Sequence, residues 1–181
     1  MMILWMTKIS KSDLLDRYFD IFILEVFTMN AYEALLDEAC DNGLTVKEKP
    51  LKYNNGRIKG NRIAIRQDID TTTEKACILA EELGHHHTTV GNILDMESAS
   101  NRKQERQARL WAYNKQIGLR GLISAYEHGC QNKYEIAEYL EVTDEFLTDC
   151  IECYRQKYGI GTTVDNYYIM FIPNLTIGKI K

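Results

Sequence analysis

The fold of this chain is decided by one helical stretch, EKACILAEELGHHH at residues 74–87. The three threonines at 71–73 supply hydroxyls that can cap a helix, and the glutamate that follows them adds negative charge near its positive end. Apolar and small residues then recur at steps of three and four, which predicts one buried face. Glu81 and His85 are four residues apart, so they project from the same side of this helix with Glu82 beside them.

This spacing is that of the H-E-x-x-H zinc helix with one change, because the first ligand position holds Glu81 instead of histidine. Glu105, which belongs to the next predicted helix, offers a third donor downstream of His85. The same residues also suit an exposed helix end with a solvated acidic pair. Glu105 equally suits an ion pair with Arg109 at i,i+4 spacing, and the spacing alone leaves both alternatives open.

Two segments, 76–91 and 101–112, resemble the ImmA/IrrE family of metallo-endopeptidases, in the short form carried by prophages and integrative elements. The resemblance covers residues 30–181 and is densest between Thr73 and Trp111. It implies an α+β fold with a zincin-like minimal metallopeptidase domain of helices and a small β-sheet. A helix-turn-helix-like helical pair and a short β tail are expected to follow. The implied activity is that of a site-specific endopeptidase.

In that resemblance Glu81, His85 and Glu105 hold Zn²⁺, and Glu82 is the catalytic general base that takes a proton from water. Two carboxylates and one histidine make a formally neutral Zn²⁺ site, whereas two histidines and one carboxylate leave a charge of +1. A neutral site polarises its ligands less, and its harder donors also admit Mn²⁺ or another divalent ion. His87 is an alternative ligand if the helix ends early and lets its ring turn back.

Three classes of function stay open. The leading one is a zinc-dependent endopeptidase that cleaves a helix-turn-helix repressor of a prophage or mobile element, which derepresses its genes. The second is a catalytically weak or inactive zincin-like protein that binds the repressor as a regulatory partner. The third is a helix-turn-helix DNA-binding regulator. Residues 131–160 hold three basic and seven acidic side chains, so direct nucleic-acid binding is not expected.

Length and composition favour an ordinary globular protein. The 181 residues can bury a real core, and 45% apolar with 27% charged residues is typical of soluble domains. No uncharged stretch reaches the ~18 residues of a membrane span. The five cysteines and the lack of a secretory leader predict reduced thiols and a cytoplasmic location. Cys150 and Cys153 form an isolated C-x-x-C, which we interpret as ordinary helix residues.

The first 28 residues do not match the rest of the chain. Residues 24–28 can be back-translated as a ribosome-binding site before a start codon at Met29, so residues 1–28 are predicted to be an over-called N-terminal extension. The remaining segments are a zincin-like metallopeptidase domain, a helix-turn-helix-like helical segment and a β-rich tail packed on the body, at residues 29–120, 121–159 and 160–181.

Two short strands are predicted before the metal helix as a hairpin, with Gly60 and Asn61 in its turn. In metallopeptidases, an exposed strand beside the metal can pair with an extended substrate by β-augmentation. Ile63, Ala64 and Ile65 are the predicted substrate-binding strand, and the alternative is a plain sheet edge.

Overall fold

The structure, a computed structural model, describes residues 29–88 and 99–180. The predicted N-terminal extension, residues 1–28, lies outside the described residues. The chain divides into two compact units, Met1–Asn30 and Ala31–Lys181, and the elements below belong to the second.

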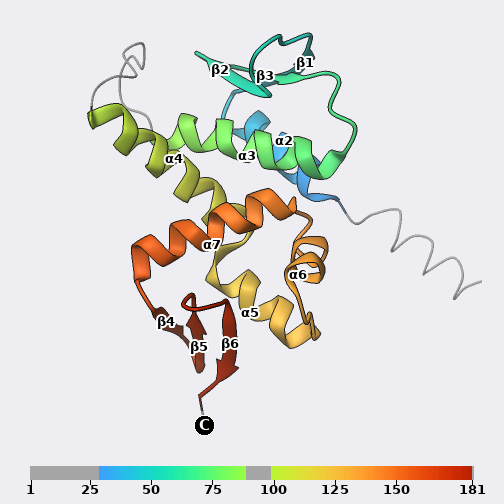
Figure 1. Cartoon of the computed structure of the whole chain (residues 1–181). Coiled ribbons are helices and arrows are strands. Elements are labelled where there is room, and N and C mark those ends of the chain that lie inside the picture. Colours follow the sequence, from blue (N-terminus) through green and yellow to red (C-terminus); the bar gives the residue numbers. More distant parts are fainter. Residues whose placement is uncertain (1–28, 89–98, 181) are drawn as a thin grey trace, which may run out of the picture. The chain divides into compact units, whose positions relative to one another are not determined.

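The described elements alternate between helices and short strands in the order seen in Figure 1. They are α2 (Ala31–Asp41), β1 (Thr45–Lys49), β2 (Gly56–Lys59), β3 (Arg62–Arg66), α3 (Thr72–Thr88), α4 (Ala99–Gln116), α5 (Gly118–His128), α6 (Lys133–Tyr139), α7 (Asp144–Tyr158), β4 (Gly161–Val164), β5 (Tyr167–Met170) and β6 (Thr176–Lys179). The mixed α+β class is therefore confirmed.

The first sheet has the strand order β1-β3-β2, and the predicted hairpin turn at Gly60 and Asn61 is confirmed. β1 pairs parallel with β3, and β2 pairs antiparallel with it. The prediction that Ile63, Ala64 and Ile65 form an exposed substrate-binding strand or a sheet edge is wrong. They lie in the central strand, whose backbone groups on both sides are already paired. The strand of this sheet that packs on α3 and keeps one free edge among the described residues is β2.

Helices α3 and α4 make the closest helix contact of the first half of the unit. A Cβ added at Gly84 would collide with the backbone carbonyl of Ala108, whose own side chain is fully buried. Two small residues therefore let the two backbones approach each other. The two helices run in opposite directions in Figure 1, so residues that precede Gly84 in α3 face residues that follow Ala108 in α4.

The second half of the unit is built from α5, α6, α7 and a separate antiparallel sheet in the order β4-β5-β6. Side-chain caps start α6 and α7: Asn132 accepts from the Glu135 N–H, and Thr143 accepts from the Phe146 N–H at 3.2 Å. The predicted β-rich tail is this sheet. Its buried Ile169 belongs to the same hydrophobic core cluster as the residues of α2 and α3.

No helix within residues 29–88 and 99–180 is long and apolar enough to cross a membrane. Cys150 and Cys153 both lie on α7, and both thiols are free. Cys150 is fully buried, and burial raises the pKa of its thiol. The interpretation of this C-x-x-C as ordinary helix residues agrees with that position.

Candidate metal centre

Helix α3 carries three of the predicted site residues, Glu81, Glu82 and His85, within about one turn of each other. Its first turn is capped as the sequence predicts, because Thr71 Oγ1 accepts a hydrogen bond from the Glu74 N–H at 3.2 Å. The helix then continues without interruption to Thr88. This regularity places Glu81 and His85 one turn apart, on the side of α3 that faces α4.

Glu105 of α4 meets His85 of α3 across the close helix contact. His85 Nε2 lies 3.4 Å from Glu105 Oε2. Two ligand atoms bound at 2.0–2.1 Å to one tetrahedral Zn²⁺ lie about 3.4 Å apart, so this separation suits two donors of a single ion. Gly84 and Ala108 create the contact, since larger residues there would push the two donors apart.

Arg109 is the second partner of Glu105. Its Nε donates to Glu105 Oε1 at 2.8 Å, so the i,i+4 ion pair that the spacing left open does form, together with the His85 contact. Arg109 also lines a cavity with Glu81. Burial raises the pKa of Glu81, and the Arg109 guanidinium opposes that shift while Glu105 adds to it. The Arg109 guanidinium therefore acts electrostatically on two of the three predicted metal ligands, Glu105 and Glu81.

Glu82 is a partly buried carboxyl whose environment suits a proton acceptor. Burial and the neighbouring Glu81 charge raise its pKa to about 7, and a backbone hydrogen bond from Ile58 of β2 opposes the shift. Gly56 at the start of β2 lies against it, because a Cβ there would come within 2.6 Å of Glu82 Oε1. The edge strand β2 therefore positions this carboxyl and removes water from one side of it.

His87 lies away from the other predicted ligands. Its ring stacks on Trp111 with centroids 4.6 Å apart, and its Nε2 is 3.7 Å from Glu38 Oε1 of α2. Burial and the neighbouring His86 lower its pKa. Because α3 remains helical through Thr88, the early helix end that would turn this ring toward His85 is not present.

The donor chemistry fits a divalent ion, although the described residues contain no group of three side chains already arranged to hold one. Carboxylate and neutral imidazole are ligands that Zn²⁺ accepts. His85 and Glu105 already lie at ligand spacing. Glu81 lines a cavity with Arg109, whose positive charge opposes the rise of the Glu81 pKa. The residues therefore fit a metal, with Arg109 as the side chain that competes with it.

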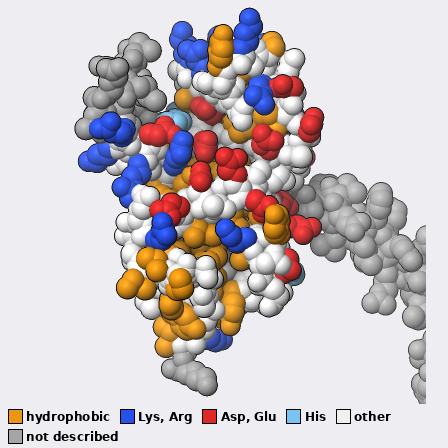
Figure 2. Space-filling view, viewed as in Figure 1, with side chains coloured by type: hydrophobic (Ala, Val, Ile, Leu, Met, Phe, Trp, Pro, Cys, Tyr) orange, Lys and Arg blue, Asp and Glu red, His pale blue; other side chains and the backbone are white. Residues whose placement is uncertain are grey.

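Acidic side chains dominate the surroundings of this site. The cavity beside Glu81 has a volume of about 240 Å³, and its lining includes four carboxylates against the one guanidinium of Arg109. Two of the four, Glu145 and Asp149, come from α7. Figure 2 shows acidic side chains gathered across the middle of this face, above a region where hydrophobic side chains prevail.

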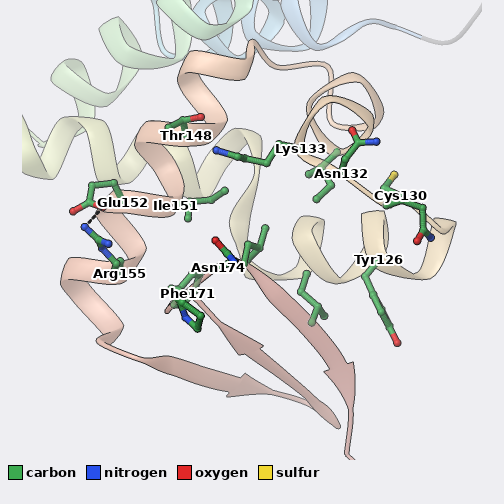
Figure 3. A pocket seen from close by; sticks show the side chains of 15 residues that line it. Tyr126, Cys130, Asn132, Lys133, Thr148, Ile151, Glu152, Arg155, Phe171 and Asn174 are labelled. Carbon is green, nitrogen blue, oxygen red and sulfur yellow. Dashed lines mark ion pairs between the residues drawn. The ribbon is translucent and has the colours of Figure 1, made fainter.

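A larger cavity of about 510 Å³ lies in the second half of the unit and contains none of the predicted site residues. Its walls come from α5, α6, α7, the segment between β5 and β6, and β6 itself. Tyr126, Ile151 and Phe171 line it, and Lys133 extends from the start of α6 toward α7 (Figure 3). The charged groups at its other end, Arg155 and Glu152, pair at 2.7 Å.

Two features of the site were not predicted from the sequence. The first is the contact of Gly84 with Ala108, for which a signal existed: glycine inside a helix costs about 1 kcal/mol relative to alanine and usually has a packing reason. The second is the closeness of Arg109 to Glu81, which depends on how the two helices cross.

The comparisons with known proteins place the chain in a family. The sequence model of the Peptidase_M78 family, described as an IrrE N-terminal-like domain, matches residues 40–149. These residues include α3, α4 and every predicted site residue. No curated protein and no solved structure matches the chain.

Proposed function

The chain belongs to the Peptidase_M78 family of IrrE N-terminal-like domains, and from that premise we propose that it is a zinc-dependent, site-specific endopeptidase whose substrate is a helix-turn-helix repressor. The family supports a metallopeptidase-like domain. The observation that carries the proposal furthest is the 3.4 Å separation of His85 Nε2 and Glu105 Oε2. It brings two donors from separate helices to the spacing of one ion, with a carboxyl of raised pKa next to them.

The roles of the side chains follow from their positions. Glu81, His85 and Glu105 would hold the ion, which when bound supplies Lewis-acid polarisation of the scissile carbonyl and of water. Glu82 is not a ligand and accepts the proton of the attacking water. Its pKa of about 7 suits this task, because a base is most effective when its pKa lies near the working pH. It can then return the proton to the leaving amine.

An extended substrate fits best along the outer edge of β2. This strand pairs with β3 on one side only among the described residues, and its residue Ile58 donates a backbone hydrogen bond to Glu82. A peptide that pairs with β2 would therefore run beside the general base. We assign the β-augmentation role to Gly56–Lys59.

The test is cleavage of a candidate repressor, in particular one encoded beside this chain, by purified protein loaded with Zn²⁺ or Mn²⁺. Glu82→Gln should keep the metal and lower the cleavage rate at least about a hundredfold. His85→Ala should lose both metal and cleavage. Glu38→Gln, which alters the partner of His87 instead, is the matched control and should cleave normally. Full cleavage by Glu82→Gln would contradict the assignment of the base.

A non-catalytic zincin-like protein that binds the repressor is the second candidate. It is supported by the Arg109–Glu105 ion pair and by the incomplete donor group among the described residues. Two results together would favour this candidate over the enzyme. The wild type would bind the repressor without cleaving it, whether loaded with Zn²⁺ or Mn²⁺, and Glu82→Gln and His85→Ala would bind it equally well.

A further inference from the structure

We propose that Arg109 is the counter-charge of the additional carboxylate at position 81 and competes with the metal for it, so that Glu81 and Arg109 act as a matched pair in setting the metal affinity. The inference rests on the metal site proposed above. It assigns a charge-balancing role to a residue that contacts the proposed ligand Glu105.

The first step is the geometry of the two helices. His85 meets Glu105, as the 3.4 Å separation shows. One turn before His85 in α3 is Glu81, and one turn after Glu105 in α4 is Arg109. Since α3 and α4 run in opposite directions, these two steps lead to the same place, and both side chains line the 240 Å³ cavity. The sequence spacing and the helix crossing together place the guanidinium beside the additional carboxylate.

The second step is the charge balance. Zn²⁺ with Glu81, His85 and Glu105 is formally neutral, whereas an H-E-x-x-H site with one further carboxylate carries +1. Arg109 restores +1 to the neighbourhood. Among the described residues that line the cavity there is no other Lys or Arg, and Glu145 and Asp149 add further negative charge. Without Arg109 these carboxylates would face one another uncompensated whenever the metal is absent.

The third step is competition. Arg109 Nε holds Glu105 Oε1 at 2.8 Å, so a metal that binds Glu105 has to share the carboxylate with the guanidinium or displace it. The Arg109 side chain is 49% exposed, and an ion pair this exposed contributes little to folding stability. The main effect of Arg109 is therefore on the affinity for a metal ion, because its positive charge repels a divalent cation bound nearby.

The experiment measures Zn²⁺ affinity of the full chain by competition with a chromogenic chelator at about pH 8. Arg109→Gln should bind Zn²⁺ about tenfold more tightly than wild type at low ionic strength, with the gain reduced in high salt. Arg109→Lys should stay within about threefold of wild type because it keeps the charge. Lys103→Gln, on an exposed position of the same helix that is not among the residues lining the cavities with Glu81 or Glu105, is the matched control and should not change the affinity.

The matched-pair claim is tested by combining substitutions. In a Glu81→His background, Arg109→Gln should raise the Zn²⁺ affinity by less than in the wild-type background, because it then frees Glu105 but no second carboxylate at position 81. Equal gains in both backgrounds would overturn the pairing, as would unchanged affinity in Arg109→Gln. Absence of Zn²⁺ binding by every variant, wild type included, would overturn the metal site itself and the inference with it. Wild-type binding with no effect of Arg109→Gln overturns the inference alone.

Discussion

The cavity beside Glu81 and the cavity between α5, α6 and α7 differ in what their walls contain. The cavity beside Glu81 is the smaller of the two, at about 240 Å³, and the described residues that line it are four carboxylates and a single cation, Arg109, among neutral side chains. The cavity in Figure 3 is about twice as large and mainly apolar, with the Arg155–Glu152 pair balanced internally. Helix α7 contributes to both, with Asp149 in the first and Ile151 in the second. The proposed metal site is distinguished by unbalanced charge beside two donors at ligand spacing, and not by the volume of its cavity.

The largest effect is expected from a substitution that disrupts the α3–α4 contact beside the smaller cavity and leaves the larger cavity unchanged. Gly84→Ala places a methyl group against the Ala108 carbonyl, which is backbone and cannot move without separating α3 from α4. We expect a loss of about 3 kcal/mol in unfolding free energy, measured by urea denaturation, together with loss of metal. Gly121→Ala is the control, since its Cβ meets only the mobile end of Leu140 at 3.3 Å. A stability equal to that of the control would contradict the close contact.

The next effect concerns pH. The folded-state pKa of Glu82 is about 7, above its value in the unfolded chain, so the folded state binds a proton more tightly. The associated stability is present at low pH and is lost as pH rises through that pKa. In metal-free protein, we expect the unfolding free energy of the wild type to fall by about 2 kcal/mol more than that of Glu82→Gln between about pH 5 and pH 8. Parallel pH profiles for the two proteins would show that this carboxyl is not perturbed.

A smaller effect should separate the two regions. Phe171 is 2% exposed, lines the larger cavity and packs against Tyr154 and Tyr158, so Phe171→Leu removes packing in this half of the unit. We expect a loss of about 1 kcal/mol, seen in the denaturation midpoint, with Zn²⁺ affinity unchanged. A change in Zn²⁺ affinity would indicate that α7 couples the two cavities.

The smallest effect tests charge in the apolar region. Lys133 lines the larger cavity from an exposed position. Lys133→Gln should change unfolding free energy by less than about 0.5 kcal/mol and leave Zn²⁺ affinity as it is. The contrast with the tenfold effect expected for Arg109→Gln would sharpen the distinction between the cavities. If both substitutions changed the Zn²⁺ affinity equally, the effect of Arg109→Gln would be explained by the net charge of the protein and not by the position of Arg109.

Local patterns predicted much of this molecule correctly. The threonine cap and the spacing of apolar residues predicted α3, and the Gly60–Asn61 turn predicted the β2–β3 hairpin. Both depend on contacts between residues close in sequence, which the chain reveals without its tertiary structure. The spacing of Glu105 and Arg109 also predicted their i,i+4 ion pair, as an alternative to Glu105 being a metal ligand, and the pair is present.

The errors concern contacts between distant segments. Ile63–Ile65 was predicted as an exposed strand because hairpins are local, but β1 joins it in parallel from across a connection that contains all of β2. Parallel pairing needs such a crossover and leaves no mark in the strand itself. His87 lies against Glu38 and Trp111 because α2 and α4 pack on that side of the helix.

The sequence by itself determined which residue types share one side of α3, where that helix begins, and the family to which the chain belongs. Helical periodicity and capping are properties of neighbouring residues, so they follow from the order of the letters. The tertiary structure alone decided that His85 meets Glu105 and that Arg109 reaches the cavity beside Glu81. These distances depend on how closely α3 and α4 approach, and that approach is set by the contact of Gly84 with the backbone of Ala108.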